Sequence, residues 1–229
     1  VEDIAVPPWV FAEFGRRPTD RGFDYPAMLF EDGRFVDHWG PGASVPDVRR
    51  LETRMWFFYR AARYIDAGHE SIHFGQVDLT GAADTDHAAW DELLTRVRKY
   101  ARRRARRGLV LASAHTYGVV RDGRLLLDFH PWPLRPDEVI GEPEKAILRL
   151  EQDMGNLNGI YRRSKGGLTP SGWRTDALPY LVDFDNYGGV GPHPGEADLT
   201  SIWTWGYDEI AWFARQSEAY RNAWLRYAW

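Results

Sequence analysis

The chain has 229 residues, a formal net charge of −4 at pH 7 and no cysteine. The negative charge and the lack of a long basic block argue against a nucleic-acid partner, and no apolar run approaches the roughly 20 residues of a membrane span. Disulfides and thiolate chemistry are excluded, and the compartment stays open between secreted and cytoplasmic. Beginning at Val1 and ending at Trp229 within a helical pattern, the sequence is consistent with a fragment.

Two amphipathic helices are predicted from apolar residues that recur every three or four positions. The first covers Asp47–Asp66 and ends before Gly68. The second helix follows a capping-type loop that starts at Asp84, and this helix ends before Gly108. A further helix is predicted to start after Ser217, which is a suitable N-cap residue.

Short apolar segments that end in polar residues predict strands between and after these helices. In chain order they are Ser71–Leu79, Leu109–Tyr117, Leu125–Trp132, Pro179–Tyr187 and Ser201–Tyr207. An Arg-Asp-Gly-Arg turn at 121–124 precedes the third of them, and Trp9–Phe14 is predicted as a first strand.

The alternation of helices and strands predicts an α/β fold with parallel strands. We expect a single catalytic domain over residues 1–229 in the form of a (β/α) barrel, which resembles a TIM barrel. About six parallel strands are recognisable where a closed barrel needs eight. The expected barrel is therefore irregular or incomplete.

In parallel α/β folds the ligand lies at the carboxyl ends of the strands. Because side chains alternate along a strand, Gln76 and Asp78 are expected on one face, as are Asp128 and His130. Carboxylates grouped with tryptophans predict glycoside hydrolysis, in which one carboxyl protonates the leaving oxygen and another attacks the sugar or activates water. The predicted carboxylate pair is Asp185 and Glu209, with Asp128 next and Asp78 and Glu13 behind it.

Other strand-end side chains are predicted to bind the carbohydrate substrate through hydrogen bonds and aromatic stacking. They are His73, Gln76, Asp78, His115, His130, Trp132, Asn186, Trp203 and Trp205. Each of these residues also has a structural interpretation, since a strand-end Asp often caps a helix and a tryptophan often packs in a core. Trp56, Trp90 and Trp224 are assigned to packing.

Two alternatives use the same residues. The histidines at 73, 115 and 130, with Asp128 and Asp185, are candidate ligands of a divalent ion that activates water. Their spacing matches no metal-binding motif, so no metal is predicted. A carbohydrate-binding protein without activity needs the tryptophans but no paired acids.

The segments HFGQVDL, LLLDFHPWPLRP, YLVDFDNYGG and WTWGYDEIAWF resemble the strand-end motifs of (β/α)-barrel glycoside hydrolases and related bacterial proteins. The resemblance extends over residues 47–229. It implies an enzyme of carbohydrate metabolism that acts on a glycan without a cofactor.

Overall fold

The computed structural model describes residues 1–134, 137–138, 146–147, 164–184, 214 and 216–228. The chain divides into two compact units, residues 1–130 with 165–179 and residues 131–164 with 180–229. The catalytic domain expected over residues 1–229 stays a prediction. Within the described part of the chain, no helix is long and apolar enough to cross a bilayer.

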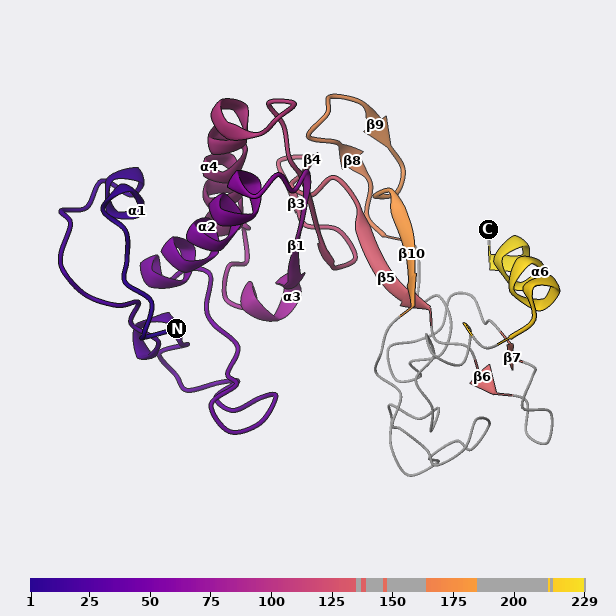
Figure 1. The fold of residues 1–229 in the computed structure, drawn as a ribbon, viewed down its shortest axis with the longest axis horizontal. Coiled ribbons are helices and arrows are strands. Elements are labelled where there is room, and N and C mark those ends of the chain that lie inside the picture. The colour runs from indigo at the N-terminus through magenta and orange to yellow at the C-terminus, as the bar shows by residue number, and fades with distance from the viewer. Residues whose placement is uncertain (135–136, 139–145, 148–163, 185–213, 215, 229) are drawn as a thin grey trace. The chain divides into compact units, whose positions relative to one another are not determined.

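The first unit contains the predicted alternation of helices and strands (Figure 1). Helix α2 (Leu51–Asp66) leads into strand β1 (Ser71–Gln76), and helix α4 (Ala88–Arg104) leads into strand β2 (Leu111–His115). Strands β1 and β2 pair in parallel. The prediction of parallel strands with an intervening helix is confirmed for this segment.

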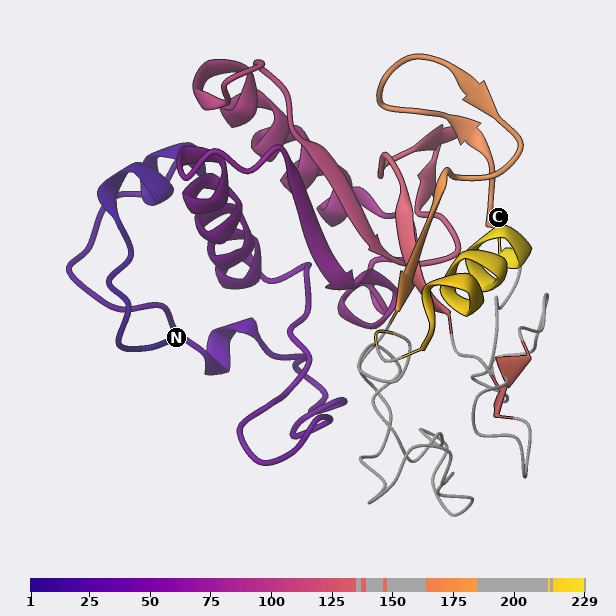
Figure 2. The same cartoon turned by 45° about the vertical axis from the view of Figure 1, so that its right-hand side comes forward.

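Helices α2 and α4 lie beside the β1–β2 pair and contact each other (Figures 1 and 2). Ile72, Ala112 and Ala114 are buried in the same hydrophobic core as the apolar faces of both helices. Because strand residues alternate between faces, His73 and Ser113 point away from this core. The second face of the strand pair therefore carries polar side chains, of which His73 is exposed and Ser113 is buried.

The start of α4 is held by the loop that the sequence predicts. The Asp84 carboxylate accepts hydrogen bonds from the backbone N–H groups of Ala89 and Trp90, at 3.1 and 3.0 Å. These are two of the N–H groups that have no acceptor within the helix. The capping prediction is confirmed.

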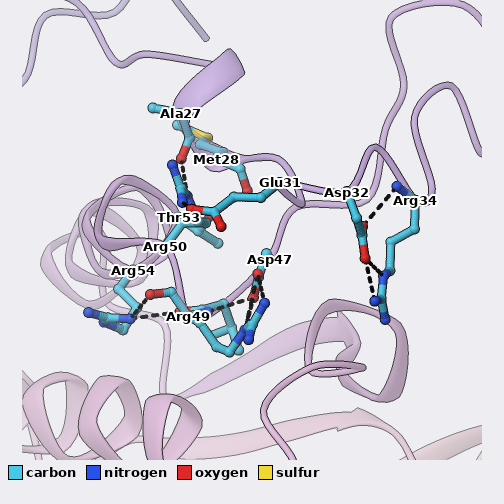
Figure 3. Close-up of polar contacts among 11 residues, drawn as sticks. Ala27, Met28, Glu31, Asp32, Arg34, Asp47, Arg49, Arg50, Thr53 and Arg54 are labelled. Carbon is cyan, nitrogen blue, oxygen red and sulfur yellow. Dashed lines mark hydrogen bonds and ion pairs between the residues drawn. The ribbon is translucent and has the colours of Figure 1, made fainter.

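Helix α2 begins four residues later than predicted because the preceding residues form a turn. The buried Asp47 carboxylate accepts the Arg49 backbone N–H at 2.9 Å and the Arg49 guanidinium at 2.8 Å. Thr53 then donates from its hydroxyl to the carbonyl of Met28, at the end of the short helix η1 (Pro26–Met28). Figure 3 shows this network, which attaches the long loop before α2 to the first turn of that helix.

The predicted first strand is wrong, because Pro8–Glu13 forms helix α1. Proline is favoured in the first turn of a helix, where its missing N–H is not needed. Val10 and Phe11 enter a second hydrophobic cluster with Phe23 and Met55. Six residues are too few for apolar spacing alone to distinguish a helix from a strand.

The expected barrel is also wrong. After β2 the chain forms an antiparallel hairpin of β3 (Val120–Arg121) and β4 (Arg124–Leu125), which confirms the predicted turn. Strands β8 (Gly167–Leu168) and β9 (Arg174–Thr175) extend this hairpin in the order β3-β4-β8-β9. The sheets of the described residues have two or four strands and do not close, whereas a barrel needs eight parallel strands. Helices and strands alternate here only as far as β2.

The second unit contains two pairs of strands. Strand β5 (His130–Leu134) pairs with β10 (Tyr180–Phe184), and β6 (Asp137–Glu138) pairs antiparallel with β7 (Ala146–Ile147). The strand predicted at Leu125–Trp132 is correct only in part, because residues 126–128 bend and β5 shares only residues 130–132 with it. Strand β10 lies within the strand predicted at Pro179–Tyr187. The strand predicted at Ser201–Tyr207 lies outside the described residues.

Helix α6 (Glu218–Ala228) forms at the end of the second unit, as predicted. The Ser217 hydroxyl accepts the Tyr220 backbone N–H at 3.2 Å, which is the geometry of an N-cap.

Candidate functional site

Three polar residues meet at the carboxyl ends of β1 and β2. The Nδ1 atom of His73 lies 3.3 Å from the Ser113 hydroxyl, and the rings of His73 and His115 meet edge to face with centroids 4.6 Å apart. Gln76 lies beside His115 in the strand register. Gly75 lies between His73 and Gln76 in β1 and has φ 74°, a conformation that glycine adopts without strain. The register of the strand pair shifts at this point.

His130 adds a buried imidazole to these strand ends. It follows Phe129, whose backbone bridges Ser113 in parallel, and it is only 2% exposed. Burial, together with the charge of the nearby His115, lowers the pKa of His130 to about 4. The His130 ring is therefore neutral at pH 7, and a neutral imidazole has one donor and one acceptor nitrogen.

The lowered pKa of His130 predicts a loss of stability in acid. As the pH falls from 6.5 to about 4, the unfolded chain takes up a proton on this ring that the folded chain does not. The free energy of unfolding therefore decreases on acidification, by up to about 3 kcal/mol. Urea unfolding of the wild type and His130→Gln, at pH 7 and at pH 4.5, measures this. The variant should lose less stability on acidification, and an equal loss in both proteins would contradict the assignment.

Asp78 is the carboxyl that lies closest in sequence to the end of β1. It is in the short helix α3 (Val77–Thr80), and its Oδ1 accepts a hydrogen bond from the Thr116 hydroxyl at 2.9 Å. Asp78 is an exposed residue, yet protein atoms surround its carboxyl group closely enough that desolvation raises its pKa. The Thr116 hydrogen bond and the charge of Lys165 lower the pKa by less than burial raises it. Asp78 therefore keeps its proton to higher pH than an ordinary aspartate.

The structure places Asp128 toward the other end of β2. Its carboxylate accepts the Ala112 backbone N–H at 2.8 Å and pairs with the Arg98 guanidinium at 3.0 Å. Ala112 is the second residue of β2, whereas His115 is the last. Asp128 also lines a cavity of about 260 Å³ next to the residues that precede β2. This geometry favours a structural role for Asp128 and does not bring it together with Asp78.

The remaining predicted residues lie largely outside the described part of the chain. Trp132 belongs to β5, and the structure describes its backbone but not its side chain. Those beyond the described residues are Asp185, Asn186, Trp203, Trp205 and Glu209. Their roles stay predictions, including the carboxylate pair of Asp185 and Glu209.

The structure also contains a cavity that the sequence did not indicate. It has a volume of about 440 Å³ and lies between α2 and β1. Trp56, assigned to packing, is only half-buried and lines this cavity together with His73. Trp90 is 1% exposed and confirms its assignment to the core. The sequence did contain a sign that Trp56 lines a cavity, because Arg60 follows it one turn later on the same face of α2.

Metal binding was the alternative use of the strand-end histidines. Within the described ranges, no group of three or more His, Asp or Glu side chains is placed to hold a metal ion. Asp185, one of the candidate ligands, is not among those residues.

The described residues thus define a mixed α/β protein with two histidines and one carboxyl of raised pKa at the ends of two parallel strands. Comparison of the chain with protein-family models, curated proteins and solved structures gave no significant match.

Proposed function

We propose that the protein hydrolyses glycosidic bonds and that Asp78 donates a proton to the leaving oxygen. The observation that carries this proposal is the raised pKa of Asp78 at the carboxyl end of β1, next to the strand that ends in His115. A glycosidase needs one carboxyl group that is protonated when the substrate binds. The sequence predicts Asp78 both as a lower-ranked catalytic carboxylate and as a substrate-binding residue, and this proposal assigns it the catalytic role.

A glycosidase also needs a second carboxylate, for which the sequence predicts Asp185 or Glu209. It attacks the sugar directly or activates a water molecule, and the distance between the two carboxyls decides which, at about 5 Å or roughly 6.5 to 9.5 Å. The exposed ring of His73 supplies a donor or an acceptor for sugar hydroxyls, whereas the buried His130 ring lies behind the strand ends.

The test is the release of sugar from a broad panel of polysaccharides and aryl glycosides, with and without a chelator. Wild type is compared with Asp78→Asn and Asp185→Asn. We expect hydrolysis that is insensitive to the chelator. Asp185→Asn should lose it on every substrate, and Asp78→Asn should lose it on polysaccharides, whose leaving oxygen needs a proton. Activity that the chelator abolishes would instead favour the metal-dependent hydrolase, and binding of a glycan without any hydrolysis would favour a carbohydrate-binding protein.

A further inference from the structure

The cavity between α2 and β1 has a ring-lined wall. Five aromatic side chains from three segments line it: Tyr25, Trp56, Phe57, Tyr64 and Phe74. Four consecutive residues of β1, from Ile72 to Gly75, also line it, so the cavity follows the edge of this strand. Aromatic faces are the usual platform for the apolar face of a sugar ring, because they bury C–H groups and leave hydroxyls free.

The cavity has one permanently charged side chain among the described residues that line it, and that charge is positive. Arg60 of α2 lines it and is exposed, and none of the described side chains that line it is a carboxylate. The guanidinium lies 5.8 Å from the ring of Trp56, and no carboxylate of the described residues pairs with it. Other arginines nearby do have such partners, as Arg54 has Glu92. Arg60 therefore keeps its planar set of donors available for a ligand carboxylate.

His73 connects the cavity to the strand-end histidines. It lines the cavity and also contacts Ser113 and His115. A sugar bound in the cavity would thus lie next to the residue to which the proposed function assigns substrate binding.

We propose that this cavity binds an acidic sugar, a uronate residue of a glycan, with its carboxylate on Arg60 and its ring on the aromatic wall. The inference deepens the proposed function by naming the substrate class, and it rests on that function only for the claim that the bound sugar belongs to a substrate. Binding itself is measured separately from hydrolysis.

The experiment is calorimetric titration with short oligomers of galacturonate, glucuronate and mannuronate, and with the matching neutral oligomers of galactose, glucose and mannose. We expect at least one acidic oligomer to bind about tenfold or more tightly than its neutral counterpart. Arg60→Gln should weaken that binding by about tenfold or more. Arg63→Gln is the matched control, because Arg63 is an exposed arginine of the same helix that does not line the cavity.

Tyr64→Ala tests the aromatic wall, and circular dichroism checks that each variant is folded. Tyr64 is 43% exposed, so its removal should spare the fold and weaken acidic and neutral oligomers alike. Equal binding of acidic and neutral oligomers, or equal effects of the two arginine variants, would overturn the proposal. Tighter binding of benzoate than of every uronate would overturn it in favour of an aromatic acid. Loss of uronate binding in Arg60→Gln, in a protein that hydrolyses no glycan, would leave the cavity assigned and refute the glycosidase alone.

Discussion

Trp90→Ala is expected to lower the free energy of unfolding by about 3 to 5 kcal/mol, the usual range for deleting a large buried aromatic side chain. Trp90 is 1% exposed and comes from the first turn of α4. Its ring stacks on Phe57 of α2, with centroids 5.8 Å apart, and meets Phe74 of β1 edge-on at 5.9 Å. Deleting it opens a cavity where two helices and a strand meet.

Trp90→Phe is the matched control for this prediction. The indole N–H is buried and has no hydrogen-bond acceptor among the described residues, so phenylalanine removes some volume but also an unpaired donor. We expect a loss below about 2 kcal/mol, since much of the ring contact is kept. Urea unfolding at pH 7 measures both variants. Equal losses in the two would show that the aromatic packing is not what stabilises this junction.

The elements around Trp90 are also those that the sequence predicts best. Helices α2 and α4 are 16 and 17 residues long, so their apolar periodicity is repeated several times and is unambiguous. The start of α2 is less predictable, because Asp47 forms a turn with Arg49 instead of continuing α2 toward its N-terminus. The turn at Asp47 depends on Met28, which lies 19 positions earlier in the chain and whose carbonyl accepts the Asp47 backbone N–H.

The barrel could not be excluded from local patterns. Each predicted strand was a local inference, whereas closure depends on which strands pair. The two-residue strands β8 and β9 contain too few residues to show any periodicity, yet they join the β3–β4 hairpin. The strand count therefore suggested a barrel that the pairing does not form.

The candidate site was predictable to a similar extent. His73 and His115 were expected together because both end parallel strands, and the structure places their rings in contact. The position of Asp128 was not predictable, since its two-residue offset from His130 fixes the face but not the partner, and Arg98 from α4 supplies that partner. The cavity wall was hidden for the same reason, because Tyr25 and Phe74 are distant in the sequence.

Asp78→Asn is expected to lower kcat on glycans by at least about 100-fold, the lower range for loss of a general acid. Asparagine has the same shape and its side-chain oxygen still accepts the Thr116 hydroxyl, so the fold should be kept. Aryl glycosides with acidic phenol leaving groups need no proton and should lose much less activity. Asp128→Asn is the comparison, since its ion pair with Arg98 predicts a lower melting temperature with kcat changed by less than about tenfold. A larger loss of kcat in Asp128→Asn than in Asp78→Asn would reverse the two assignments.

The pH dependence tests Asp78 as the acid more directly than its removal does. If Asp78 must be protonated, kcat/KM falls as pH rises through its pKa, which burial raises above the usual aspartate value. Lys165 holds that pKa down, so Lys165→Gln should raise it and move the fall in kcat/KM to higher pH. Lys99→Gln removes the same charge from an exposed position on α4 and should leave the profile in place, because Lys99 is not among the groups that shift the pKa of Asp78. A profile that Lys165→Gln leaves unchanged, or moves to lower pH, would assign the proton to another carboxyl.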